Sequence, residues 1–245
     1  MHDRLLILSD IHANLSALEA VLEDVGRRGL RPDGIVVLGD IINYGMRPNE
    51  TIAAMKRLPC PVAVNIFGNH EKALLDGDMS RFSTDRGRRM LEHTAAILSD
   101  ESMAYMARMN RDGREAHRWQ GKRLLFVHGS ISDSFWGSIR ADNISDDAYA
   151  RYDIVISGHS HVPHLTERFY PVDDLAMRNR KRTLFINPGS VGQPRNHNPR
   201  AQYVYMELSS ETICFHAVEY AVEAEQSLYP DFLDDFYRKR LSLGI

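Results

Sequence analysis

Short segments that carry histidine or carboxylate side chains recur along this sequence, each at the end of an apolar run. In chain order, their residues are Asp10, His12, Asp40, Asn69, His70, His128, His159 and His161. The aspartates, the asparagine and four of the histidines supply mixed oxygen and nitrogen donors, which suit borderline divalent cations. Two such cations that share one carboxylate form an arrangement that cleaves phosphate esters. The residue types therefore indicate phosphate ester chemistry at a metal centre.

The spacing of the donors indicates how they share the metals. Asp10 and His12 are two residues apart, so both can face one ion across a turn. Asp40 follows Gly39, where the absence of a Cβ atom lets the backbone approach a site closely. A carboxylate has two oxygens and can bridge two cations, and Asp40 is the candidate for that role. The imidazoles favour Mn, Fe, Zn or Co over Mg or Ca, without choosing among the four.

The elements before these motifs alternate between strands and helices. Continuous apolar runs predict strands at 5–8, 35–38 and 62–66, and periodic or proline-initiated segments predict helices at 14–28 and 48–58. Such strands are typically parallel and covered on both faces. Ligands of open α/β sheets bind beyond the carboxyl ends of the strands. Because each motif begins where an apolar run ends, we expect the motifs to converge in space.

The rest of the chain extends this pattern. Residues 71–115 are expected to form a helical excursion, with helices at 71–76, 86–98 and 100–109. Further strands are expected at 124–127, 154–156, 183–186, 202–208 and 212–218, and a final amphipathic helix at 230–241. The order of elements predicts an α/β sandwich with outer helices and mixed sheets. We expect residues 1–245 to form a single domain.

The composition limits the kinds of molecule that the protein is expected to bind. The chain has 245 residues and a formal net charge of −3, which disfavours binding of long nucleic acid. Two distant cysteines provide neither a disulfide framework nor a thiolate metal site. No apolar run is long enough to span a bilayer, and the first one is too short for a signal sequence. We therefore expect a cytoplasmic protein with no membrane partner; the sequence does not indicate an oligomeric state.

The motif series D-x-H, G-D, G-N-H-[ED], H and G-H-x-H resembles the calcineurin-like metallophosphoesterase superfamily. The resemblance runs from Asp10 to His161 and implies a four-layer α/β/β/α fold with a dinuclear centre. The ligands that it implies are Asp10, His12, Asp40 and His161 for one metal, and Asp40, Asn69, His128 and His159 for the other. It also implies that His70 is catalytic and assists the leaving oxygen. The metals would share and activate a bridging hydroxide that attacks phosphorus in line.

Other segments resemble a bacterial branch of small phosphoesterases and phosphodiesterases within this superfamily. The segment 187–195 reads N-P-G-S-V-G-Q-P-R, and its Arg195 is a candidate phosphate contact because guanidinium matches phosphate oxygens. Tyr44 and Arg47 are weaker candidates for contact with substrate. The resemblance implies a small phosphorylated substrate of nucleotide type. The six histidines outside the motifs are expected to be structural or superficial, namely His2, His93, His117, His164, His197 and His216.

One departure from the superfamily affects the choice of substrate. Protein serine/threonine phosphatases and symmetrical diadenosine-tetraphosphate hydrolases follow G-D with an acid and then R-G. In this sequence Asp40 is followed by residues 41–45, Ile-Ile-Asn-Tyr-Gly, so the acid that orients the catalytic histidine is missing. The main hypothesis is a phosphodiesterase or nucleotide polyphosphate hydrolase. The alternatives are a phosphomonoesterase or phosphoprotein phosphatase and, in a different class, a non-catalytic metal-binding scaffold.

Overall fold

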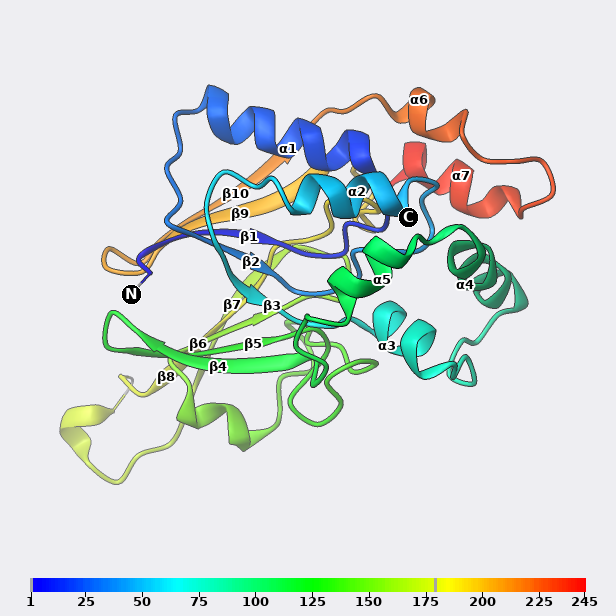
Figure 1. Ribbon diagram of the computed structural model, residues 1–245. Coiled ribbons are helices and arrows are strands. Elements are labelled where there is room, and N and C mark those ends of the chain that lie inside the picture. Colours follow the sequence, from blue (N-terminus) through cyan, green and yellow to red (C-terminus); the bar gives the residue numbers. More distant parts are fainter. Residues whose placement is uncertain (1, 179) are drawn as a thin grey trace.

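Two five-stranded sheets face each other in the computed structural model, which describes residues 2–178 and 180–245 (Figure 1). The first sheet has the order β10-β9-β1-β2-β3. Its strands are β1 (Arg4–Leu8), β2 (Gly34–Val37), β3 (Val62–Asn65), β9 (Ala201–Glu207) and β10 (Thr212–Val218). The first three are parallel, and β9 and β10 add an antiparallel hairpin beside β1. The parallel start of the sheet agrees with the continuous apolar runs of the sequence.

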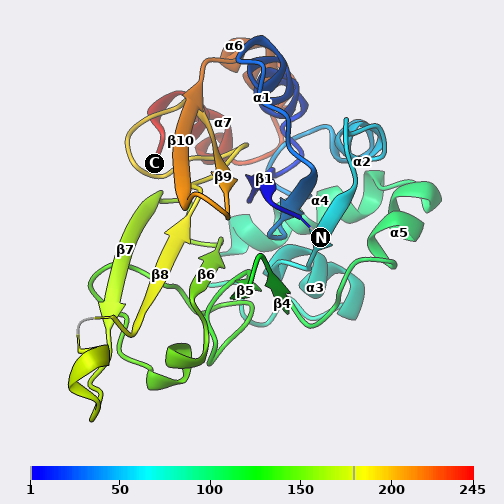
Figure 2. The same cartoon turned by 90° about the vertical axis from the view of Figure 1, so that its left-hand side faces the viewer.

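The second sheet has the order β4-β5-β6-β8-β7. Its strands are β4 (Arg114–Trp119), β5 (Lys122–Val127), β6 (Ile154–Ser157), β7 (His164–Phe169) and β8 (Arg182–Asn187). The three central strands are parallel, whereas both edge strands are antiparallel to their neighbours. Figure 2 shows the two sheets one above the other, with α1 and α2 on the outer side of the first.

The helices complete the layers. They are α1 (Leu15–Arg27), α2 (Pro48–Met55), α3 (Asn69–Asp76), α4 (Asp85–Ile97), α5 (Asp100–Met106), α6 (Val222–Gln226) and α7 (Asp235–Leu243). On the far side of the second sheet, the 3-10 helix η1 (Asp147–Arg151) places Tyr149 against Phe185; a second, η2, spans Leu175–Met177. This arrangement confirms the predicted four-layer α/β sandwich with mixed sheets. Among the described residues, no helix has both the length and the apolar character needed to cross a membrane.

The core is divided between the faces of the first sheet. Leu5 and Ile7 point toward the second sheet, where they pack with Phe126 and Ile156. Residues of the opposite parity, such as Leu6, pack under the outer helices. Alternate side chains of β1 therefore belong to two different cores, as the period-two geometry of a strand requires. Both faces of β1 are fully buried, which fixes the end of the strand where Asp10 follows.

The structure corrects three expectations about elements. The strands β4 and β7 were not predicted, because both are edge strands in which exposed residues mostly alternate with half-buried ones, without the apolar runs of the central strands. The helix expected at 230–241 begins only at Asp235, where the side chain of Asp234 caps it. The short helix α6, which precedes it, was also missed.

Candidate metal centre

The predicted donors gather at one edge of the two sheets. Asp10 and Asp40 lie just beyond β1 and β2, Asn69 opens α3 after β3, and His128 and His159 lie just beyond β5 and β6. These are the carboxyl ends of parallel strands, where the α/β architecture collects ligands. All eight motif residues are buried or nearly buried at this edge. The structure therefore brings together residues that lie up to 151 positions apart in the sequence.

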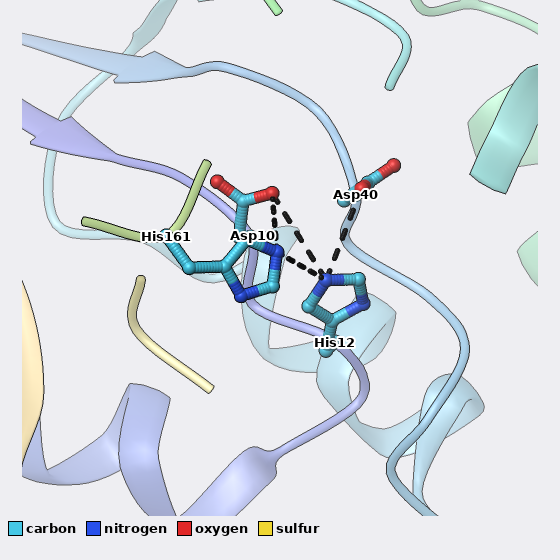
Figure 3. Close-up of side chains that lie close together, drawn as sticks. All are labelled: Asp10, His12, Asp40 and His161. Carbon is cyan, nitrogen blue, oxygen red and sulfur yellow. Dashed lines mark hydrogen bonds and ion pairs between the residues drawn. The ribbon is translucent and has the colours of Figure 1, made fainter. Parts of the chain in front are cut away.

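One group of donors consists of Asp10, His12, Asp40 and His161, whose ligand atoms all lie within 4.8 Å of one another (Figure 3). The Nε2 atoms of His12 and His161 are 3.2 Å apart. Asp10 Oδ1 lies 3.1 Å from His161 Nε2, and Asp40 Oδ2 lies 3.8 Å from His12 Nε2. These four residues surround a common point with two oxygen and two nitrogen donors.

A second group consists of Asp40, His128 and His159, with Asn69 beside it. Asn69 Oδ1 lies 3.0 Å from both His128 Nε2 and His159 Nδ1. Asp40 Oδ2 lies 3.3 Å from His128 Nε2, so the same oxygen faces both groups. Asp40 Oδ1 instead accepts a hydrogen bond from the backbone N–H of His70, at 3.0 Å. The structure thus gives Asp40 the position of a shared carboxylate.

Backbone carbonyls orient three of the imidazoles. The Nδ1 atoms of His12, His128 and His161 lie 3.1, 2.7 and 2.5 Å from the carbonyl oxygens of Ile42, Leu38 and Gln193, respectively. A carbonyl oxygen can only accept, so each Nδ1 carries a proton and donates it. The lone pair of each neutral ring is then on Nε2, which faces the other donors. This pattern is the usual outer support of a metal-binding histidine.

The donor atoms are better satisfied by bound cations than by hydrogen bonds within the protein. Two Nε2 lone pairs only 3.2 Å apart, on His12 and His161, repel each other unless a positive charge lies between them. Asp10 Oδ1 is buried and accepts no hydrogen bond within the described parts of the chain, although Oδ2 accepts two, from Ser9 Oγ and the N–H of His159. A buried carboxylate oxygen without a partner is costly. The residues present therefore fit divalent metals with N and O ligands.

The charges within the cluster are strongly coupled. Burial raises the pKa of Asp40, but the nearby rings of His128 and His70 outweigh this effect and hold the pKa well below its usual range. Burial lowers the pKa of His128, yet the charge of Asp40 raises that pKa to about 9. Burial lowers the pKa of His70 to about 4, so this ring is neutral near pH 7. The site thus combines ionised carboxylates with a neutral histidine.

The loops that present the ligands have a strained backbone. Positive φ angles occur at Asp10 (52°), His12 (49°), Asp40 (52°), His159 (63°) and His161 (58°). Left-handed conformations of residues other than glycine are costly and concentrate at functional sites. Close approach of two loops adds a further constraint, since a Cβ atom on Gly68 would lie only 2.0 Å from Asp40 Oδ1. The conformation of these turns therefore serves the placement of the donor side chains rather than the local preference of the backbone.

Asn43 contacts the predicted catalytic histidine, a role that the sequence analysis missed. Its amide nitrogen lies 2.6 Å from His70 Nδ1, and Thr94 Oγ1 donates to its amide oxygen at 3.2 Å. Because the amide nitrogen donates to Nδ1, the proton of the neutral His70 ring is on Nε2. The residue that orients His70 is thus an amide in place of an acid. A polar residue three positions after Asp40, between apolar neighbours, is the signal that could have identified it.

Glu71 is a second residue that the sequence analysis did not place in the site. Its fully buried carboxylate accepts hydrogen bonds from the backbone N–H groups of Asp40 (2.8 Å), Ile41 (2.7 Å), Ile42 (3.1 Å) and Gly68 (2.9 Å). Burial and the charge of Asp40 raise its pKa to about 7, although the hydrogen bonds from Gly68, Ile42 and Asp40 act to lower the pKa. Glu71 therefore ties the loop that carries Asp40 to the start of α3.

Of the hollows that adjoin the metal centre, two share His159 and Arg195. The first, the inner hollow, has a volume of about 240 Å³ and aromatic walls. Its other lining residues include Tyr44, His70, Phe82, Trp136 and Tyr237. The second, the outer hollow, has a volume of about 600 Å³. Its other lining residues include Ser138, Arg140, Ala141, Ser160, Val162 and His164.

The predicted substrate contacts have different surroundings. Arg195 lines both hollows, and its backbone N–H donates to the carbonyl of His161 at 3.1 Å. Tyr44 lines the inner hollow, with its ring stacked on Tyr237 of α7 at 4.5 Å. Arg47 instead pairs with Glu225 and contacts Ser16, so its side chain anchors α6. Tyr237 was not predicted, because only the tertiary fold brings the C-terminal helix to the site.

Comparisons with known proteins agree with this geometry. A family model described as the calcineurin-like phosphoesterase superfamily domain matches residues 4–211. The solved structure of a metallophosphoesterase from Sphaerobacter thermophilus is 31% identical, with a TM-score of 0.73 and full coverage of both chains. An uncharacterized protein of Methanocaldococcus jannaschii is 29% identical over 246 residues, or 97% of each chain. The phosphodiesterase YfcE of Escherichia coli K12 is 24% identical over 196 residues, which cover 80% of this chain and 83% of that one.

The family match and the site lead to one identification. The match spans more than four-fifths of the chain, from β1 to the turn before β10, and includes every motif residue. The buried cluster of aspartates and histidines supplies the metal donors that such an enzyme requires. The chain therefore belongs to the calcineurin-like phosphoesterase superfamily, and it is a metal-dependent phosphoesterase.

Proposed function

We propose that this protein hydrolyses small phosphodiesters, in particular nucleotide-like ones, or nucleotide polyphosphates, at two divalent cations. The ligands would be Asp10, His12, Asp40 and His161 for one cation, and Asp40, Asn69, His128 and His159 for the other. The observation that carries the proposal is the position of Asp40 Oδ2, which faces His12 on one side and His128 on the other. Mn, Fe, Zn and Co all suit this donor set.

Bound cations would supply Lewis-acid activation of water and of the phosphate oxygens. The residues around them would do the rest. Arg195 lines the hollow beside the cluster, and its guanidinium can donate hydrogen bonds to two phosphate oxygens. His70 lines the same hollow, and its Nε2–H can donate to the leaving oxygen. The ring of Tyr44, packed at 4.7 Å from that of His70, limits how the substrate enters.

Two observations support a diester in preference to a phosphoprotein. YfcE, which shares 24% identity over most of this chain, is described as a phosphodiesterase. The inner hollow has a volume of only about 240 Å³ and is walled by aromatic rings, which leaves little room for a folded polypeptide. Hollows on both sides of Arg195 instead suit a phosphate with two substituents.

We also propose that residues 1–245 act as one catalytic domain. Asp10, Asp40 and Asn69 belong to strand ends of the first sheet, whereas His128 and His159 belong to the second. Neither sheet alone carries a complete donor set. The helices α3 and α4 and the C-terminal helix α7 line the inner hollow and would select the substrate.

The proposal is tested with protein stripped of metal and then supplied with Mn, Fe(II), Zn, Co or Mg. The substrates are bis-p-nitrophenyl phosphate, p-nitrophenyl phosphate and diadenosine tetraphosphate. We expect turnover of the diester with at least one of the first four metals, and slower turnover of the monoester. Absence of turnover of every substrate with every metal would contradict the proposal.

Substitutions at Asp40 and His128 test the ligand assignment in the same assay. Asp40→Asn and His128→Ala should each reduce kcat/KM by at least about 100-fold, because the first removes the negative charge and one oxygen of the shared carboxylate and the second removes an imidazole donor. Metal content, measured by atomic emission, should fall in parallel. The matched control is Asp173→Asn, which changes an exposed aspartate outside both hollows and should leave activity and metal content unchanged. Full activity of Asp40→Asn with two bound metals would refute the bridging assignment.

A further inference from the structure

The two hollows differ in what they can hold. The inner hollow, at about 240 Å³, is below the roughly 300–1,000 Å³ of typical small-molecule sites, and the outer hollow, at about 600 Å³, is well within that range. The inner hollow is bounded by the donors Asp40, Asn69 and His161. Any cations and the phosphate itself must share that small space. Of the two, the outer hollow is therefore the one with room for a large substituent on the phosphate.

Arg195 marks the boundary between the hollows. It lines both of them, and it forms no ion pair with any residue in the two described ranges. Its Nε atom is buried and without a hydrogen-bond partner among those residues. An unpaired guanidinium beside a metal cluster is suited to a phosphate oxygen. A phosphate that contacts Arg195 would therefore lie between the small, aromatic inner hollow and the larger outer hollow.

The outer hollow has the chemistry of a site for a nucleoside. The side chain of Arg140 lies at its rim, where it is 65% exposed and paired with Asp142, and its planar guanidinium can stack on a base. His164 presents a buried Nε2 atom without a hydrogen-bond partner in the described structure, and Ser138 and Ser160 add hydroxyl groups. Val162, on the same wall, provides apolar contact. Such a mixture of groups binds a sugar and a base better than it binds a simple alkyl group.

We propose that the outer hollow binds a nucleoside substituent of the phosphodiester, so that the substituent in the inner hollow is the one that leaves. This inference rests on the proposed phosphodiesterase activity. Its direction follows from His70, which lines the inner hollow and not the outer one. In the reaction, a water oxygen bonds to phosphorus and the bond from phosphorus to the inner ester oxygen breaks. That oxygen keeps the electron pair and takes a proton, and the nucleoside keeps the phosphate.

The test compares two diesters that have the same leaving group. Thymidine 5′-(p-nitrophenyl phosphate) carries a nucleoside as its second substituent, and methyl p-nitrophenyl phosphate carries only a methyl group. We expect the wild-type protein to prefer the thymidine diester by at least about 10-fold in kcat/KM, which corresponds to about 1.4 kcal/mol of additional binding. The products should be p-nitrophenol and thymidine 5′-monophosphate, with no free thymidine.

Variants that fill the outer hollow show whether the preference arises there. Ala141→Trp and Ala141→Phe each place an aromatic ring in the hollow from an exposed position. Each variant should abolish most of the preference, mainly through a higher KM for the thymidine diester. Turnover of the methyl diester should stay within about twofold of the wild-type value. Ala104→Trp is the matched control, because Ala104 is exposed on α5 and lines neither hollow. Binding of thymidine 5′-monophosphate, measured by calorimetry, should weaken in parallel in the two filled variants only.

The possible failures are distinguishable. If neither diester is hydrolysed with any metal, the phosphodiesterase activity itself is wrong. If the methyl diester is hydrolysed and the wild type shows no preference, the activity stands and the nucleoside subsite is wrong. Equal losses on both diesters in the filled variants, or release of free thymidine by the wild type, would also overturn the subsite.

Discussion

At the scale of single residues, the orientation of His70 has a simple basis. The usual acid partner is absent, and the amide of Asn43 contacts His70 Nδ1 at 2.6 Å. The hydroxyl of Thr94 donates to the amide oxygen of Asn43, which leaves the amide nitrogen to face the ring. An amide donor holds the neutral ring with its proton on Nε2, whereas a carboxylate would favour the opposite tautomer and the charged form.

This arrangement predicts the effect of removing the amide. Asn43→Ala should lower kcat by about 10- to 100-fold for a diester with a poor leaving group, because general acid assistance contributes about 100- to 10,000-fold and misorientation loses part of it. A diester with a p-nitrophenyl leaving group needs little protonation and should lose much less. KM should change little in both cases. Steady-state rates with methyl phenyl phosphate and methyl p-nitrophenyl phosphate measure the difference.

A control separates this role from general damage to the site. Ser83→Ala changes another residue of the inner hollow that has no contact with the His70 ring among the described hydrogen bonds, and it should affect both leaving groups equally or not at all. Metal content of Asn43→Ala should match the wild type, since Asn43 is not among the donors. Equal loss on both leaving groups in Asn43→Ala would mean that His70 does not assist departure.

At the scale of elements, Glu71 joins the loop after β2 to the segment that follows β3. Its carboxylate accepts four backbone N–H groups, three from the loop after β2 and one from the start of α3. Four donors on one carboxylate form a concave anion site that only an acidic side chain fills. The loop that carries Asp40 therefore depends on a residue that lies on the following helix.

Glu71→Gln should disturb that loop without removing a metal donor. The glutamine amide has one acceptor oxygen, and its NH₂ group would face backbone N–H groups that cannot accept. Because each buried donor left without a partner costs about 1–3 kcal/mol, we expect a clear loss of stability. Metal affinity should fall by about 10- to 100-fold, as for other residues that support ligands. Thermal melts and metal titrations measure both effects, with Glu92→Gln, an exposed residue of α4, as the unaffected control.

The elements also show what the sequence could reveal and what it could not. The central strands have continuous apolar runs, so their ends, and with them Asp10, Asp40 and His128, could be placed from local pattern. The edge strands β4 and β7 lack that pattern because one of their sides faces solvent. Contacts such as that of Tyr237 with Tyr44 join residues 193 positions apart, and no local rule predicts them.

At the scale of the whole molecule, the candidate metal centre joins the two sheets. Asp10, Asp40 and Asn69 come from the first sheet, and His128 and His159 come from the second. Without cations, the ends of the sheets bring together buried carboxylates and the Nε2 lone pairs of His12 and His161, which lie 3.2 Å apart. Metal binding should therefore stabilise the contact between the sheets as well as the local loops.

Removal of metal should lower the melting temperature, and the size of this decrease should depend on donors from both sheets. At a free metal concentration 100 times Kd, binding to the native state adds about 2.7 kcal/mol of stability. For a chain of this size, each kcal/mol shifts Tm by about 2–4 °C, so chelation should lower Tm by about 5–10 °C. Asp10→Ala in the first sheet and His128→Ala in the second should each lose most of this response, whereas Asp173→Asn should keep it.

Hydrogen exchange should show added protection on metal binding at the ends of both β1 and β5. Protection confined to one sheet would mean that the metals are held by that sheet alone, and the centre would then not be a link between the two.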